Sequence, residues 1–237
     1  MTSDCFSLGD LAFACYVYKS MTGYDKSVAD FRRLTKPGVD LALPEHRYHL
    51  LHWLNRWGCR HLATDHHDLA SASLAGWYQA NQSRLPGLDA RLGSLEDSQL
   101  EQFVALFDSL KNLDAARKTR GGQSHTVSLG PTAAAKTLFA LRPHVFVAWD
   151  DAIRSNLGHD GSGASYVRLL ADVRGKLRTI ANQCATLDIP LDALPKTVGR
   201  PQSTAAELIN EYYWVTLTRK VIPPEPARIR RWLDWSN

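Results

Sequence analysis

The chain has 237 residues, of which 44% are hydrophobic and 22% are charged, and its formal net charge is +4. This balance excludes an intrinsically disordered chain and allows a compact domain with a sizeable core. No stretch reaches the roughly 18 apolar residues of a membrane span, and residues 1–9 lack the pattern of a secretory signal, so we expect a cytoplasmic protein with no membrane partner.

The first half of the chain is predicted to be helical. Pro44 suits the first turn of a helix, and the apolar residues after it recur at spacings of three and four until Gly58 ends the pattern. Ser94 begins a capping-box pattern, with an acidic residue three positions later. The helices predicted in this half are residues 11–21, 27–34, 44–57, 65–79 and 98–113.

The second half is also predicted to be helical, with longer interruptions. Residues 118–125 are polar and contain glycine, which predicts a loop, and residues 188–202 are rich in proline and glycine, which predicts a linker. The helices predicted here are residues 133–141, 150–157, 166–187 and 203–219, with a short helical tail after Pro226. No alternating apolar pattern is long enough to predict a sheet, so the expected fold class is all-α.

Positive charge gathers in one stretch of the sequence. Residues 111–142 contain a single acidic residue, Asp114. In residues 87–110, by contrast, five of the six charged residues are acidic. The basic residues of the stretch are Lys111, Arg117, Lys118, Arg120, Lys136 and Arg142. Duplex DNA carries a negative charge about every 1.7 Å along its axis and would be attracted to such a surface.

The cysteines and histidines do not predict a metal site or a cofactor. Cys5, Cys15, Cys59 and Cys184 are scattered without a C-x-x-C pair, and we expect them to be reduced. Histidines recur every three residues, whereas helical zinc motifs use a spacing of four and a third ligand, which is not evident here. The histidine-rich group consists of His46, His49, His52, His61, Asp65, His66 and His67.

Residues 127–158 read VSLGPTAAAKTLFALRPHVFVAWDDAIRSNLG. This segment resembles the hairpin and catalytic loop of the helix-hairpin-helix (HhH-GPD) DNA glycosylase superfamily, which includes the endonuclease III and 8-oxoguanine glycosylase types. Their pattern runs as L-P-G-V-G-x-K-T-A, an apolar helix, and V-D-T-H-V with the catalytic aspartate. When Asp150 is set on that aspartate, Ser128, Leu129 and Gly130 fall on the Gly-apolar-Gly hairpin and Thr132 falls on the lysine, without a gap.

A second resemblance is closer. The strings KTLFALRP and FVAWD, together with HLLHWLNRWGCR upstream, are similar to bacterial proteins described as having an 8-oxoguanine DNA glycosylase (OGG) fold, over about residues 44–170. The resemblance implies a two-lobed helical fold in a single domain of residues 1–237, with a cleft between the lobes. It implies a monomeric DNA glycosylase that binds double-stranded DNA, flips out a damaged or modified base and hydrolyses its N-glycosidic bond.

The resemblance assigns roles to particular residues. A carboxylate at Asp150 would stabilise the oxocarbenium-like transition state, and Asp151 is the fallback for this role. The alternative is that Asp150 only caps a helix and has no catalytic role. Backbone amides of the hairpin, Ser128, Leu129, Gly130 and Thr132, would grip a DNA phosphate without reading sequence.

Thr132 stands where lyase-active relatives carry a lysine, so we expect a monofunctional enzyme that leaves an abasic site. Lys136 lies one helical turn further on the same face, which leaves two roles for it: a phosphate contact or a displaced Schiff-base lysine. Arg154 is a further candidate for a phosphate contact. The candidate catalytic residues are therefore Asp150 and Lys136.

A flipped base must be held between aromatic or apolar side chains. Any single aromatic residue is more often part of a core than of a pocket. The candidates for the base pocket are Trp53, Trp57, Trp149, Tyr212, Tyr213 and Trp214.

Two other classes of function remain open. One is a catalytically inactive helix-hairpin-helix module that binds DNA or another partner. The presence of Thr132 where lyase-active relatives carry a lysine is consistent with this class. The other is a small-molecule or metal enzyme that uses the histidine-rich group. Neither the base that would be excised nor the setting, DNA repair or defence against phages with modified DNA, follows from the sequence.

Overall fold

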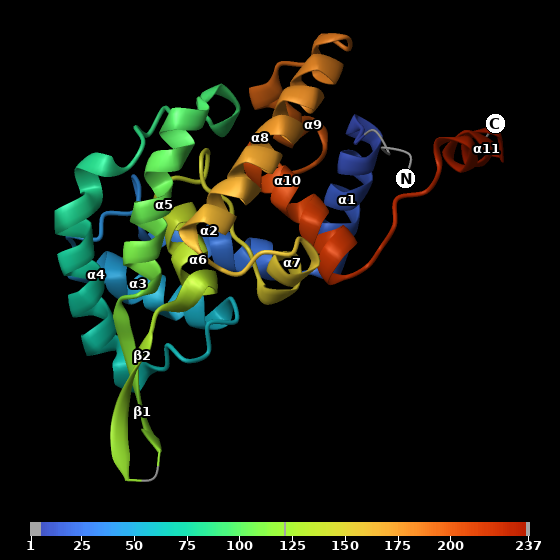
Figure 1. The fold of residues 1–237 in the computed structure, drawn as a ribbon. Helices are drawn as coiled ribbons and strands as arrows, with labels where there is room; N and C mark the ends of the chain where they lie inside the picture. Colours follow the sequence, from blue (N-terminus) through green and yellow to red (C-terminus); the bar gives the residue numbers. More distant parts are fainter. Residues whose placement is uncertain (1–5, 121, 236–237) are drawn as a thin grey trace.

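The computed structural model describes residues 6–120 and 122–235. Within these residues the chain is predominantly helical and has one two-stranded sheet, and the fold is drawn in Figure 1. The α-helices are α1 (Leu8–Met21), α2 (Tyr24–Leu34), α3 (Pro44–Arg56), α4 (His67–Asn81), α5 (Asp97–Lys111), α6 (Gly130–Leu141), α7 (Asp151–Asn156), α8 (Gly163–Ala185), α9 (Leu194–Thr197), α10 (Ala205–Tyr213) and α11 (Pro226–Trp235). Short turns of 3-10 helix are η1 (Thr64–His66), η2 (Gln82–Arg84), η3 (Leu92–Ser94) and η4 (Leu191–Ala193), and the π-helical turn η5 (Trp214–Thr218) follows α10.

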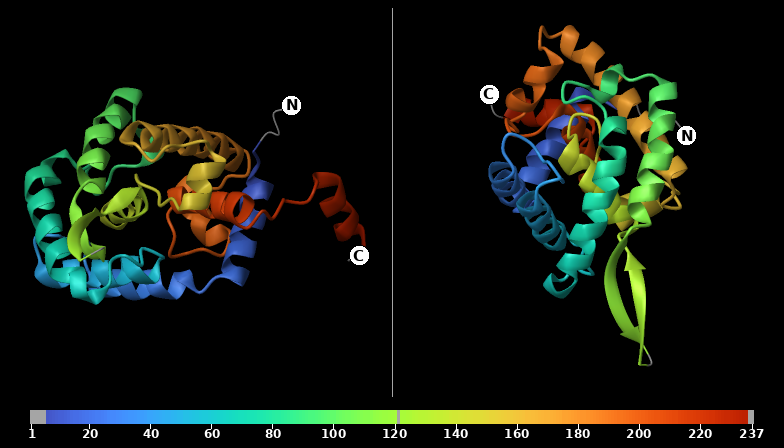
Figure 2. Two further views of the ribbon diagram at one scale, coloured as in Figure 1. Left: turned by 60° about the horizontal axis from the view of Figure 1, so that its bottom comes forward. Right: turned by 90° about the vertical axis from the view of Figure 1, so that its left-hand side faces the viewer.

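Helix α6 is the central element of the fold. It lies in the interior between α3 and α5 (Figure 2), and all its residues from Ala133 to Phe139 are buried. A helix that is buried all round needs small and apolar side chains, and the run of alanines after Pro131 supplies them. One continuous hydrophobic cluster surrounds it and joins residues from Leu11 to Tyr213.

The predicted helices agree with the structure, but the predicted capping box does not. Pro44 occupies the first turn of α3, as its sequence context predicts. The capping box of α5 is formed by Glu96 and Gln99, not by Ser94, because Ser94 ends a separate 3-10 turn. Helix α10 begins at Ala205, after its cap Thr204, and not at residue 203. The predicted linker 188–202 contains η4 and α9.

The prediction of a loop at residues 118–125, and of no sheet, is wrong. Strands β1 (Asp114–Arg120) and β2 (Gln123–Ser128) pair antiparallel and form a hairpin that projects from the helical body (Figure 1). Its turn contains Gly122, whose φ is 80°. Because the outer part of both strands is polar and exposed on each face, the sequence lacks the alternation that predicts a strand.

The start of α8 packs closely against α5. A Cβ atom at Gly163 would lie 2.3 Å from the carbonyl oxygen of Val104. We therefore expect Gly163→Ala to lower the free energy of unfolding by about 1–3 kcal/mol, measured by urea denaturation, because the two helices must move apart. Gly175→Ala on the same helix is the control: no atom lies within 4 Å of its added Cβ, so it should stabilise by up to about 1 kcal/mol. Equal stability of Gly163→Ala and wild type would contradict this packing.

Helix α11 stands apart from the body in Figure 1 and in the left view of Figure 2. Residues 219–225 connect it to η5. Among the residues that the structure describes, no helix combines the length and the apolar character needed to cross a membrane.

Candidate active site

The loop between β2 and α6 places the start of α6 beside the segment before Asp150. Gly130 opens α6 with a φ of 77°, a left-handed conformation that glycine adopts without steric cost. The amide of Leu129 donates to the carbonyl oxygen of Leu113 at 2.7 Å, so it is not free for the phosphate contact predicted for it. The amides at the first turn of α6, from Gly130 onward, are the ones without an intrahelical acceptor.

Asp150 caps helix α7 and is held by two contacts. Its Oδ1 accepts a hydrogen bond from the amide of Ile153 at 2.7 Å, and Thr218 Oγ1 donates to Oδ2 at 3.1 Å. The side chain is half-buried. Asp150 is therefore a helix cap, and the same residue also lines a cavity. Holding by an amide and a hydroxyl fixes its orientation without neutralising it.

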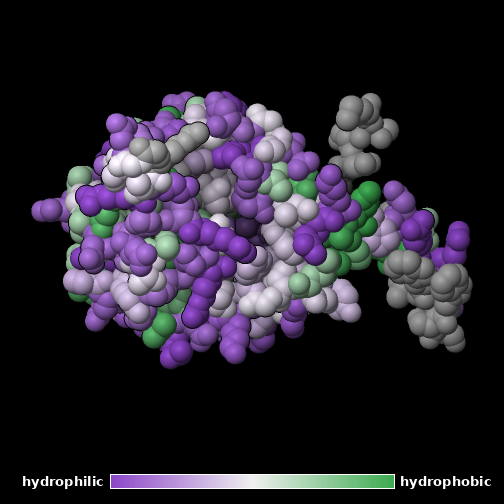
Figure 3. Space-filling view, turned by 90° about the horizontal axis from the view of Figure 1, so that it is seen from below, coloured by the Kyte–Doolittle hydropathy of each residue, from purple (hydrophilic) through white to green (hydrophobic). Residues whose placement is uncertain are grey.

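A cavity of about 550 Å³ lies at this point and brings together side chains from distant parts of the chain. Its size is within the range of small-molecule sites. The face seen from below, from which the hairpin projects, is mostly hydrophilic and is hollowed near its centre (Figure 3). The predicted residues that line the cavity are Asp150, Asp151, Lys136, Leu129, Gly130, Thr132, Arg154, Trp57, Trp149 and Trp214.

Lys136 points into the protein from the second turn of α6. Its ammonium group donates to the carbonyl oxygen of Trp57 and lies 5.6 Å from the centre of the Trp57 ring. Burial lowers the pKa of Lys136, and the nearby Asp150 charge opposes this effect. Only 7% of the residue is exposed, so its amine lies inside the cavity and not on the outer surface of the protein.

Aromatic rings form one wall of the cavity. The rings of Tyr24 and Trp57 have centres 5.6 Å apart, and those of Tyr24 and Trp214 are 6.4 Å apart. Tyr18 packs edge-on against Trp214 at 5.2 Å. Such a set of rings can stack on a flat heterocycle from the side.

Two of the predicted pocket residues belong to the core. Trp53 is 3% exposed and stacks on Phe31 with ring centres 4.9 Å apart. Tyr213 is also 3% exposed, and its hydroxyl donates to Asp172. The structure therefore places Trp53 and Tyr213 in the core and not in the lining of the cavity.

Two further predicted residues do not line the cavity, and Trp149 lines it with a ring that is buried. The Trp149 ring is fully buried, and its Nε1 donates to the carbonyl oxygen of Pro131 at 3.0 Å, which ties the α6 start to the segment before Asp150. Tyr212 packs on Phe6 and does not line the cavity. Ser128 is exposed at the end of β2 and does not line it either.

Arg154 does line the cavity, and it forms an ion pair with Asp151. The Asp151 side chain is 79% exposed, so it is much more open to water than that of Asp150.

Several residues of the cavity were not predicted as site residues, among them Tyr18, Tyr24, His61 and Asn210. Tyr18 and Tyr24 come from α1 and α2, Asn210 from α10, and His61 from the loop after α3. His61 donates from Nε2 to the carbonyl oxygen of Leu129 at 3.1 Å, and burial lowers its pKa. No spacing in the sequence links these positions, because helix packing alone brings them together.

The histidine-rich group is dispersed in the structure. His46 Nδ1 accepts from the amide of Asp40 at 3.0 Å, and the rings of His52 and His67 pack edge-on at 4.7 Å. In residues 6–120 and 122–235, no three side chains of the kinds that bind metals come together.

Cys15, Cys59 and Cys184 are free and buried. Cys5 lies outside the described residues.

Comparison with known proteins adds no further constraint, because no family model, no curated protein and no solved structure matches this chain.

Proposed function

We propose that this protein is a DNA glycosylase that flips a damaged or modified base out of double-stranded DNA and hydrolyses its N-glycosidic bond. One observation carries the proposal: the Asp150 carboxylate, the first turn of α6 and an aromatic wall all face the same cavity of about 550 Å³. This combination can bind a DNA strand, a sugar and a base at one nucleotide. The sequence resemblance of residues 127–158 to the helix-hairpin-helix glycosylases points to the same activity.

In this proposal Asp150 acts on the sugar. As the C1′–N bond breaks, the base leaves with the bonding electron pair and takes up a proton, and positive charge develops on the sugar. The fixed carboxylate stabilises this charge and orients a water molecule. The water oxygen bonds to C1′ and gives its proton to the carboxylate, so the products are a free base and an abasic site.

The base would be held by the aromatic wall. Trp57 and Trp214 are far apart in the sequence and both line the cavity, and the Tyr24 ring packs against both of them. Stacking on such rings contributes about 1–3 kcal/mol per base and is tolerant of the base's identity. This wall therefore supports binding of a flipped base without selecting it.

The hairpin β1–β2 would contact the duplex beside the cavity. Arg117 and Lys118 are exposed on it, and a two-stranded ribbon fits a DNA groove. We expect replacement of both residues by alanine to reduce the slope of log K against log salt for DNA binding by about 1.8, since each phosphate contact contributes about 0.9. Fluorescence anisotropy at several salt concentrations measures the slope. Thr119→Ala on the same strand is the control, and an unchanged slope in the double variant would exclude the hairpin as a phosphate-binding element.

The direct test is release of a free base. Purified protein is incubated with duplexes that each contain one uracil, hypoxanthine, 8-oxoguanine, 3-methyladenine or modified cytosine, and the filtrate is examined by mass spectrometry. We expect at least one free base, with an equal number of abasic sites in the DNA. Tight DNA binding without any release would favour the inactive DNA-binding module.

A second candidate activity is strand cleavage at the abasic site by Lys136. The observation that favours it is a buried amine, with a lowered pKa, in the same cavity as Asp150. A neutral amine can add to C1′ as the base leaves, the sugar opens to an imine, and loss of a C2′ proton expels the 3′ phosphate. Borohydride should then trap a covalent protein–DNA adduct that Lys136→Gln does not form. Base release without an adduct in wild type would leave hydrolysis alone.

A further inference from the structure

The chain leaves the helical body at the end of η5 and continues as a projecting segment, residues 219–235, which we call the C-terminal arm. It consists of the connection 219–225 and helix α11, which stands apart from the body (Figure 1). Five basic and two acidic residues give the arm a net charge of +3, and the whole chain has +4. The function proposed above assigns no role to this segment.

The positive charges of the arm are free for an external partner. All its basic side chains are exposed, and in the described part of the chain none of them forms an ion pair. These side chains are Arg219, Lys220, Arg228, Arg230 and Arg231.

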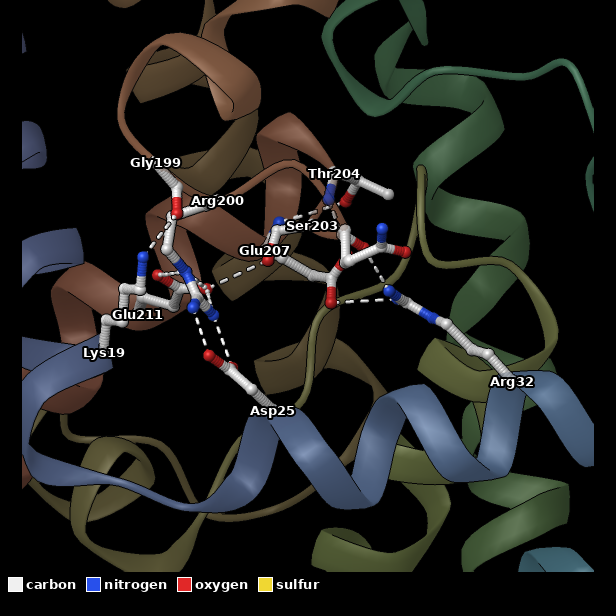
Figure 4. A network of polar contacts seen from close by, with 10 residues as sticks. Lys19, Asp25, Arg32, Gly199, Arg200, Ser203, Thr204, Glu207 and Glu211 are labelled. Atoms are coloured by element: carbon white, nitrogen blue, oxygen red, sulfur yellow. Dashed lines mark hydrogen bonds and ion pairs between the residues drawn. The ribbon is translucent and has the colours of Figure 1, made fainter.

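Arginines next to α10 in the body are arranged differently. Arg200 forms ion pairs with Asp25 and Glu211, and Arg32 forms one with Glu207 (Figure 4). The charge of such a guanidinium is largely balanced by its close neighbours. The arm has no such balance, so its charge acts on molecules outside the protein.

The root of the arm is fixed at the cavity that contains Asp150. The Arg219 guanidinium lies 5.3 Å from the centre of the Trp214 ring, which lines that cavity. The preceding residue, Thr218, donates to the Asp150 carboxylate. Two consecutive prolines then stiffen the connection, because proline-rich segments are extended and semi-rigid. The arm therefore leaves the cavity in a defined direction.

The arm and the β1–β2 hairpin lie on opposite sides of the hollow in the protein surface. In the view from below, the hairpin lies to the left of this hollow and α11 lies to its right (Figure 3). The hairpin also carries exposed cations, Arg117 and Lys118. A polyanion that crosses the hollow would therefore meet positive charge on both sides of it.

We propose that the C-terminal arm binds the phosphate backbone of double-stranded DNA on the side of the cavity away from the hairpin. This inference rests on the proposed function and deepens it, because the same duplex supplies the nucleotide that enters the cavity. Exposed arginines contact phosphates without reading bases, so the arm adds affinity at any sequence. A helix of ten residues is about 15 Å long and can follow about four or five base pairs.

The first test removes three charges from α11 by combining Arg228→Gln, Arg230→Gln and Arg231→Gln. Glutamine is about as good a helix former as arginine, so α11 should keep its structure. We expect the slope of log K against log salt for DNA binding to fall in magnitude by about 2.7, since each phosphate contact contributes about 0.9. An unchanged slope would overturn the inference.

A matched control carries the same change to glutamine at three exposed basic residues of η2, α8 and α9. These residues are Arg84, Arg178 and Lys196. The control should keep the wild-type slope. An equal fall in the control and in the arm variant would overturn the inference, because the loss would then reflect net charge and not the arm.

A second test locates the arm on the DNA. Each duplex contains one tetrahydrofuran nucleotide, a stable abasic analogue that sets the register at the cavity, and is extended by about ten base pairs, one helical turn, on one side or the other. We expect the arm variant to lose at least about tenfold of the affinity gained from one extension, and Arg117→Ala with Lys118→Ala to lose the gain from the other. Loss of the same extension in both variants would overturn the inference.

The two proposals fail in different ways. DNA binding that depends on the arm, without release of a base from any duplex, would overturn the glycosylase activity and support the arm. Base release by the wild type, with equal salt slopes in the wild type and the arm variant, would overturn the arm alone. Binding to phosphatidylserine vesicles that the arm variant loses, while its DNA binding is unchanged, would overturn the inference and assign the arm to an anionic membrane.

Discussion

Asp150→Asn is expected to lower the rate of base release by at least about a hundredfold and to leave DNA binding within about twofold of wild type. The substitution removes the negative charge that would stabilise the sugar cation. The oxygen of an asparagine can still accept the hydrogen bond from the Ile153 amide, its NH2 group can donate to Thr218 Oγ1, and it is as good a helix cap as aspartate. The variant should therefore fold normally, and single-turnover release together with anisotropy separates chemistry from binding.

Two further variants control this result. Asp188→Asn changes the charge at an exposed site away from the cavity, and asparagine suits its φ of 55°. It should release base at the wild-type rate. Asp151→Asn tests the neighbouring carboxylate, whose side chain is 79% exposed and paired with Arg154. A larger loss in Asp151→Asn than in Asp150→Asn would move the proposed role to Asp151.

Arg200→Met is expected to lower the free energy of unfolding by about 3–5 kcal/mol. Arg200 is 6% exposed, and it donates to Glu211, which is 5% exposed, at 2.8–3.1 Å. Removing the guanidinium leaves the Glu211 carboxylate buried without its charge partner. The double variant Arg200→Met with Glu211→Leu removes both charges and should recover most of the loss. Urea denaturation at pH 7 measures all three proteins.

The deficit of Arg200→Met should depend on pH. Burial raises the pKa of Glu211 to about 7, even though the Arg200 charge opposes the effect, while the unfolded value is about 4.3. The folded state therefore binds a proton that the unfolded state releases, and this contribution to stability is present below about pH 4.3 and lost as the pH rises through 7. Without Arg200 the loss is larger, so the deficit should be greater at pH 8 than at pH 5. A deficit that grows on acidification would contradict this account.

Helices were predictable here because each has an apolar face and a clear start or end. The hairpin was not predictable, because the outer parts of its two strands contact no core and so carry no alternation of apolar and polar residues. Its pairing comes from backbone hydrogen bonds and from the turn at Gly122, neither of which requires a particular side-chain pattern.

Only those residues of the site that lie close together in the sequence were predictable. Asp150, Thr132 and Lys136 lie within one segment, residues 127–158, and the resemblance of that segment to the glycosylase motif placed them together. Trp53 and Trp57 lie one helical turn apart on α3, and sequence spacing gave them equal standing. Trp57 lines the cavity from the C-cap position of the helix, whereas Trp53 is buried in the core.

The same limit applies near the other end of the chain. Tyr213 and Trp214 are adjacent, so their side chains leave the helix in different directions, one into the core and one toward the cavity. Asn210 and Tyr18 enter the cavity from helices that no sequence pattern links to Asp150. These contacts depend on the whole fold.

The hydrogen bond from Thr218 to Asp150 bears on the order in which a nascent chain can fold. The carboxylate precedes the hydroxyl that orients it, which belongs to η5, by 68 residues. A growing chain therefore cannot form the full set of contacts at Asp150 until η5 has left the ribosome.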